Sequence, residues 1–267
     1  METATFVQVL DREGVLLAKA AEAAGTGGKV PTCPGWQVRD LLRHTGMVHR
    51  WAAAIVAEGH TAPRRDGGLP DLDGTALLAW FREGHRGLVD TLAGASPDVR
   101  CWHFLPAPSP LAFWARRQAH ETTVHRIDAE SASGGEPTGI GVDFAVDGID
   151  ELLRAFHARP KSAVRTETPR TLRVRATDAP GAVWTVRLST RPPETERGDA
   201  GRTGVTHDTE DTENVEDTED VEDVDCELAG PAAQLYSALW NRRPFPEVAG
   251  DASLAALWRE KSGVTWN

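Results

Sequence analysis

The first half of the chain contains four stretches in which apolar residues recur at the spacing of one face of an α-helix. Segments rich in proline and glycine, among them GTGG, GHTAPRRDGGLPDLDG and PAPSP, separate these stretches, and GGEP follows the last. Amphipathic helices of similar length can bury their apolar faces against one another, which predicts a four-helix bundle with room for a site in its core. The expected helices cover residues 3–24, 36–55, 75–94 and 111–131.

The second half of the chain, from about residue 139, has a different pattern. Residues 143–158 have helical spacing, whereas TLRVRATD and AVWTVRLST alternate around a turn at residues 178–181, which predicts a β-hairpin. DCELAG is a further candidate strand, and PAAQLYSALWNRR and ASLAALWREK are candidate helices. We therefore expect an α+β protein with a four-helix bundle at residues 1–138 and a smaller α+β domain at residues 139–267.

One segment carries a negative charge equal to the whole net charge of −11. Residues 206–225 hold 11 Asp and Glu and no Lys or Arg, and without them the acidic residues number 29, the same as Lys and Arg together. The total charge therefore supports neither nucleic-acid binding nor an acidic substrate. A segment so poor in apolar side chains cannot bury apolar area, so we expect a disordered surface insertion at about 195–225. A calcium-binding tract is disfavoured because the run lacks the glycine turn of a calcium loop.

Neither a secretory signal nor a membrane span is expected. The first residues, METATFVQVLDREG, lack the basic start and long apolar run of a signal peptide, and no stretch of 18 apolar residues occurs. Cys33, Cys101 and Cys226 are far apart and form no C-x-x-C pair, which argues against a disulfide framework and against a thiolate zinc site. We expect a cytoplasmic protein.

The stretch RQAHETTVHRID in the fourth helix contains H-E-x-x-x-H, which is one residue longer than the H-E-x-x-H motif of zinc proteases. His120 and His125 are five residues apart, about 140° around a helix, so they cannot both face one metal ion. Glu121 and His125 are four residues apart, about 40° around the helix, and can supply two ligands from one face. A third ligand must come from elsewhere, and the second helix offers His44 and His49. Two His and one carboxylate, with water in the fourth position, are the ligands of a catalytic zinc site.

Periodicity leaves open which side of the fourth helix is buried. The stripe that carries Glu121 and His125 can equally be a solvated face with a scattered His and two acids. His120 can be a histidine at the edge of the core, and His49 and His60 can lie on the surface. The two stripes consist of Phe113, His120, Val124 and Ile127, and of Trp114, Glu121, His125, Asp128 and Ala132.

Three stretches of the chain resemble the mycothiol-dependent maleylpyruvate isomerase family. They are VPTCPGWQVRDLLRHTGMVHRW at residues 30–51, WARRQAHETTVHRIDAE at 114–130 and LYSALWNRRPFPEVAGDASLAALWREK at 235–261. The N-terminal resemblance rests on a P-G-W turn, a His eight residues after the Trp, and E-x-x-x-H on the last helix of the bundle. The resemblance implies a DinB-like metal-binding bundle followed by a C-terminal domain similar to sterol-carrier proteins.

The resemblance also implies which residues form the site. In the family a His of the second helix and the Glu and His of the fourth helix bind a divalent metal, usually zinc, and these positions correspond to His44, Glu121 and His125. An Arg of the C-terminal domain approaches the active site in the family, which gives Arg242 as the catalytic candidate and Arg243 as a near rival. Our own inference from spacing is that Asp128, one turn beyond His125, either orients that ring or forms a surface salt bridge.

The activity implied by the resemblance is that of a metal-dependent thiol transferase or isomerase that uses mycothiol. A metal ion with an open position lowers the pKa of a thiol, and the metal-bound thiolate would attack an electrophilic small molecule. Addition, rotation and elimination would give cis–trans isomerisation, whereas addition alone would give an S-conjugate. The alternative is a non-catalytic metal or small-molecule binding protein of the same fold, and a metal-dependent hydrolase ranks last because no extra general base is evident. A monomer or weak homodimer is expected.

Overall fold

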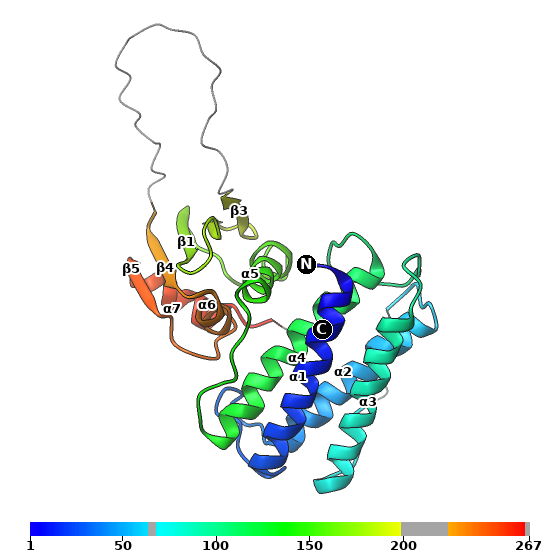
Figure 1. Cartoon of the computed structure of the whole chain (residues 1–267). Coiled ribbons are helices and arrows are strands. Elements are labelled where there is room, and N and C mark those ends of the chain that lie inside the picture. Colours follow the sequence, from blue (N-terminus) through cyan, green and yellow to red (C-terminus); the bar gives the residue numbers. More distant parts are fainter. Residues whose placement is uncertain (64–67, 199–223, 265–267) are drawn as a thin grey trace, which may run out of the picture. The chain divides into compact units, whose positions relative to one another are not determined.

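Four long helices in the first half of the chain are followed by a mixed α and β part in the computed structural model (Figure 1). The structure describes residues 1–63, 68–198 and 224–264. The chain divides into two compact units, Met1–Gly139 and Ile140–Asn267. The expected fold class, an α+β protein with a four-helix bundle before a smaller α+β part, is confirmed. Across the described ranges, no helix is both long enough and apolar enough to cross a membrane.

The helices of the first unit are α1 (Thr3–Ala24), α2 (Val38–Ala57), α3 (Gly74–Gly94) and α4 (Pro110–Ser133). Local signals in the sequence fix where two of them begin. The Ser109 hydroxyl accepts a hydrogen bond from the backbone N–H of Ala112 at 3.1 Å, and Pro110 occupies the first position of α4. The Asp40 carboxylate accepts a hydrogen bond from the backbone N–H of Gln37 at 2.9 Å, just before α2. These caps fix where α2 and α4 begin.

Helix α4 is buried around most of its circumference. Of its 24 residues 17 are buried, and they come from both predicted stripes, so the alternative of a solvated second stripe is wrong. The polar residues stay in the core because they have partners: the fully buried Arg126 donates from Nε to Glu13 of α1 at 2.7 Å and from Nη1 to Glu130 at 2.6 Å. The ion pair helps to hold α1 beside α4 (Figure 1).

The described residues of the second unit form a five-stranded sheet and four helical segments. Its strands lie in the order β3-β2-β1-β4-β5, in which β1 and β4 are parallel and the other neighbours are antiparallel. The expected hairpin is formed by β1 and β2. The elements are α5 (Val142–Asp150) with its π-helical continuation η1 (Glu151–Phe156), β1 (Arg170–Ala176), β2 (Val183–Leu188), β3 (Glu194–Gly198), β4 (Cys226–Gly230), α6 (Ala232–Leu239), β5 (Glu247–Gly250) and α7 (Ala252–Lys261).

Two strands lie where the sequence predicts none. Strand β3 falls at the start of the expected insertion, where it pairs with β2, and Glu196 of β3 forms an ion pair with Arg187 at 2.7 Å. Strand β5 pairs with β4 at the other edge of the sheet. Both strands are short and largely exposed, so no alternation of apolar side chains marks them in the sequence. The rest of the expected insertion, residues 199–223, lies outside the described residues.

His157, just after η1, is a buried titratable group in the second unit. Its Nδ1 is 3.0 Å from the Ser162 hydroxyl, and its ring contacts the edge of the Trp258 ring with centroids 4.7 Å apart. Burial, together with the charge of Arg159, lowers the pKa of His157 to about 4. The folded protein therefore holds this imidazole neutral at a pH at which an unfolded chain would protonate it.

We expect the second unit to lose stability as the pH falls from 7 to 5, because the unfolded state takes up a proton below pH 6.5 and folded His157 does not. At pH 5 His157 lowers the free energy of unfolding by about 2 kcal/mol, at roughly 1.4 kcal/mol per pKa unit. Denaturant unfolding at both pH values measures it. His157→Phe should show a smaller difference between the two pH values than the wild type, whatever its absolute stability. An equal difference in both proteins would contradict the assignment.

Candidate metal centre

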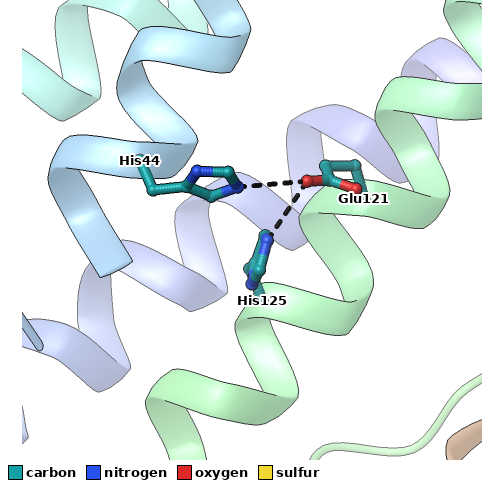
Figure 2. Close-up of side chains that lie close together, drawn as sticks. All are labelled: His44, Glu121 and His125. Atoms are coloured by element: carbon teal, nitrogen blue, oxygen red, sulfur yellow. Dashed lines mark hydrogen bonds and ion pairs between the residues drawn. The ribbon is translucent and has the colours of Figure 1, made fainter. Parts of the chain in front are cut away.

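Three side chains from two helices meet inside the first unit. His44 extends from α2, and Glu121 and His125 extend from α4 toward it (Figure 2). Glu121 Oε1 is 3.5 Å from His44 Nε2 and 3.1 Å from His125 Nε2, and the three ligand atoms all lie within 4.8 Å of one another. In the parts of the chain that the structure describes, this is the one group of His, Cys, Asp and Glu side chains arranged to hold a metal ion.

The other histidines of the two helices lie elsewhere. His120 is fully buried on another side of α4, where its ring meets that of Phe6 with centroids 6.0 Å apart. The interpretation of His49 as a surface residue is wrong: it is fully buried, and its Nε2 is 2.9 Å from the Thr122 hydroxyl. The reason is that α2 packs against both α3 and α4, which leaves little of its circumference exposed. His60, by contrast, is about a third exposed and interacts with Glu58.

The carboxylate of Glu121 is buried among positive partners. Burial favours its neutral form, but the charge of His125 and hydrogen bonds from His125 and His44 outweigh this and hold the pKa of Glu121 well below its ordinary value. Arg117, one turn earlier and fully buried, adds to the effect from 3.4 Å to the second oxygen, Oε2. Glu121 is therefore ionised at neutral pH.

His125 interacts with a carboxylate on each side. Burial lowers the pKa of its imidazole, but Glu121 and Asp128 together outweigh burial and raise it to about 9. Asp128 Oδ2 is 2.9 Å from His125 Nδ1. Because an ionised carboxylate only accepts, Nδ1 carries a hydrogen, and Nε2 is the atom that faces Glu121. A cation held by the same atoms would replace the proton on Nε2.

Asp128 is fully buried, so the alternative of a surface salt bridge is wrong. Its carboxylate contacts Nδ1 of His125, on the side of the imidazole ring away from Glu121. The exposure of the three candidate ligand side chains is uneven: 23% for His44, 10% for His125 and 6% for Glu121. The site is thus enclosed on the α4 side and more accessible at His44.

Sequence reasoning missed Trp36, Thr32 and Arg117. Trp36 lies before α2 and packs against both imidazoles, with ring centroids 5.3 Å from His44 and 6.5 Å from His125. The P-G-W turn marked the position of Trp36 without indicating these contacts. Arg117 was detectable in principle, because it stands four residues before Glu121 on one helix face. Thr32 contacts Asp128, which lies 96 positions further along the chain, and no local sequence pattern indicates such a contact.

Arg242 belongs to the second unit, just after α6. Its backbone N–H donates to Ser237 O at 2.8 Å, and its Nη1 donates to Trp240 O at 2.7 Å. Arg243 follows it on the same turn. The three candidate ligands lie in the first unit, so the catalytic role expected of Arg242 stays a prediction.

Gln118 is a polar residue of α4 close to the site in sequence and fully buried. It stands three residues before Glu121 and seven before His125, on the same side of the helix. Neither atom of its amide has a hydrogen-bond partner among the described residues. A buried polar group without a partner costs stability, because the unfolded chain can hydrogen-bond it to water.

Comparison with known proteins finds two family models that together span most of the chain. The mycothiol maleylpyruvate isomerase N-terminal domain matches residues 7–130, and the C-terminal domain of the same family (MDMPI) matches residues 143–257. A crystal structure of a mycothiol-dependent maleylpyruvate isomerase with one histidine replaced by alanine has a similar fold, with a TM-score of 0.57 and 11% sequence identity over 91% of this chain and 90% of that chain. No curated protein sequence matches the chain significantly.

We expect Gln118→Met to raise the free energy of unfolding of the first unit by about 1–2 kcal/mol, because it removes two unpartnered polar atoms at nearly constant volume. Denaturant unfolding of the metal-free protein measures the change. Gln8→Met, at an exposed position of α1, is the matched control and should change stability little. A loss of stability in Gln118→Met would show that the amide has a partner.

Proposed function

Because the chain belongs to the mycothiol-dependent maleylpyruvate isomerase family, we propose that it is a metal-dependent thiol transferase or isomerase that uses mycothiol. The observation that carries the proposal is the convergence of His44, Glu121 and His125 on one point inside the bundle. Family membership suggests the thiol, mycothiol, and the class of reaction. A metal ion bound by the three side chains would activate that thiol.

The donor atoms fit a divalent metal. Two imidazole nitrogens and one carboxylate oxygen are the ligand types of a catalytic zinc site, which keeps a fourth position for an exchangeable ligand. Ligands about 2.0 Å from a tetrahedral ion lie about 3.3 Å from one another, as follows from the bond lengths of such sites. The separations of Glu121 Oε1 from the two histidine nitrogens, 3.5 and 3.1 Å, fall on either side of that value. Zinc is our first proposal, although the same ligands also suit nickel, cobalt or iron.

Residues around the three proposed ligands orient them and leave one side accessible to a thiol. Asp128 keeps the hydrogen of His125 on Nδ1 and so leaves Nε2 to face Glu121. Arg117 engages the oxygen of Glu121 that points away from the histidines and thereby orients the other oxygen toward them. The greater exposure of His44 marks the side from which a small thiol can approach. A divalent ion, when bound, lowers the pKa of a coordinated thiol and so makes thiolate available at neutral pH.

The proposed reaction partners are mycothiol and a small electrophile. The thiolate of mycothiol adds to an electrophilic carbon, and the product is an S-conjugate if the reaction stops there. Rotation about the former double bond and elimination of the thiol give cis–trans isomerisation instead. No cysteine is needed as a nucleophile in this scheme, and Cys101 and Cys226 are buried, with thiol pKa values raised by burial.

We further propose that Arg242 contacts the substrate. We also propose that the protein acts in the cytoplasm as a monomer or weak homodimer.

We expect the purified wild-type protein to bind about one zinc or cobalt ion per chain and to conjugate mycothiol to a generic electrophile. His44→Ala should weaken metal binding by more than about 100-fold, because loss of a direct ligand costs more than loss of a group behind one. Competition with a chromogenic chelator measures affinity, and loss of free thiol measures turnover. His60→Ala, which replaces a partly exposed histidine after the end of α2, is the matched control and should behave as wild type.

Two outcomes would contradict the proposal. If the folded wild-type protein binds no divalent ion, the three side chains are a hydrogen-bonded cluster and no metal-dependent mechanism applies. If metal binds but no mycothiol is consumed across a broad set of electrophiles, the chain is a non-catalytic metal or small-molecule binding protein of the same fold.

A further inference from the structure

We propose that Thr32 is a positioning residue of the metal centre, which acts through Asp128 to fix the orientation of His125. The inference rests on the proposed function, because that function supplies the metal ion. Thr32 lies in the turn before α2 and is far from His125 in sequence. The turn would therefore contribute to the geometry of the metal centre.

The contacts form a continuous chain from the turn to the ligand. The Thr32 hydroxyl donates to Asp128 Oδ1 at 2.6 Å, and Asp128 Oδ2 accepts from His125 Nδ1 at 2.9 Å. Each carboxylate oxygen therefore has its own partner, and the plane of the carboxylate is set from both ends. A carboxylate held by one oxygen could rotate about its side-chain bonds and let the imidazole turn with it. Thr32 removes that freedom.

Thr32 can hold the Asp128 carboxylate only if its own position is fixed, and backbone hydrogen bonds in the turn fix it. The backbone N–H of Val30 donates to Trp36 O at 3.0 Å, and that of Trp36 donates to Cys33 O at 3.0 Å, so the segment closes on itself. Gly35 has a φ of +88° at the third position of the four-residue turn that ends at Trp36, a conformation suited to glycine. The proline before it favours the same turn type.

The environment of Asp128 also favours a positioning role. Asp128 is fully buried, so water does not compete strongly for its oxygens. Ser131, one turn along α4, donates to the backbone O of Asp128 at 2.7 Å, and its hydroxyl oxygen is 3.2 Å from that of Thr32. The same turn places Trp36 against both His44 and His125. One short segment thus constrains two of the three proposed ligands.

A plain structural role makes a different prediction. If the Thr32 hydroxyl serves only to anchor the turn to α4, its removal lowers stability and leaves the folded protein's metal affinity unchanged. If it positions His125, removal weakens metal binding in protein that is still folded. Metal affinity and the coordination spectrum of bound cobalt therefore separate the two roles.

The experiment compares Thr32→Val, which keeps the shape and loses the hydroxyl, with Thr32→Ser, which keeps the hydroxyl. Zinc and cobalt affinities are measured by chelator competition, and the visible spectrum of the cobalt form reports ligand geometry. We expect Thr32→Val to weaken both affinities about tenfold, at the low end for residues behind a ligand, and to alter the cobalt spectrum. Thr32→Ser should restore both to near wild type.

Two further variants complete the design. Thr91→Val, which removes a hydroxyl that donates to Gly87 O within α3, is the matched control and should bind metal as the wild type does. Thr32→Ala repeats the test without a methyl group against Asp128, in case Thr32→Val does not fold. Wild-type affinity and an unchanged cobalt spectrum in a folded Thr32→Val or Thr32→Ala protein would overturn this inference alone. Absence of metal binding by the wild type would overturn the proposed function and this inference together.

Discussion

The buried negative charge of Glu121 is the constraint on which the rest of the first unit depends. An isolated carboxylate in the core of a bundle would take up a proton, because burial disfavours its charged form. Here His44 and His125 approach one oxygen, and Arg117 approaches the other, so the charge is retained. The arrangement requires α2 and α4 to pack with one register, since His44 comes from one helix and its partners from the other. The same cluster that permits burial of the charge offers three donor atoms to a metal ion.

Keeping so polar a helix in the core requires further pairing. Arg126 faces another side of α4 and is neutralised by Glu13 and Glu130, which helps to hold α1 in place. Asp128 is bound by His125 on one side and by the turn before α2 on the other. Glu121, Arg126 and Asp128 each have a partner outside α4, so these polar residues help to specify how α4 packs. Gln118, whose amide has no partner in the described structure, departs from this pattern.

Local periodicity predicts elements well where one face is apolar and poorly where it is not. The four bundle helices and the β1–β2 hairpin follow from their patterns, and α2 and α4 begin at caps that the sequence supplies. Strands β3 and β5 were missed because most of their side chains are exposed, so that backbone pairing with β2 and β4 alone defines them. His49 was misjudged for a related reason: a histidine gives no sign of burial, and the neighbouring α3 and α4 decide it.

The sequence by itself determined the fold class and the helical spacing that sets Glu121 and His125 on one face and turns His120 away, because both depend on periods along a single element. The family resemblance, and not periodicity, selected His44 over His49. Only the tertiary structure decided that these three side chains lie within reach of one another, that Asp128 is buried, and that Thr32 meets it. The contact between Thr32 and Asp128 joins residues 96 positions apart, and His44 comes from a different helix than Glu121 and His125. No local pattern encodes a distance between separate elements.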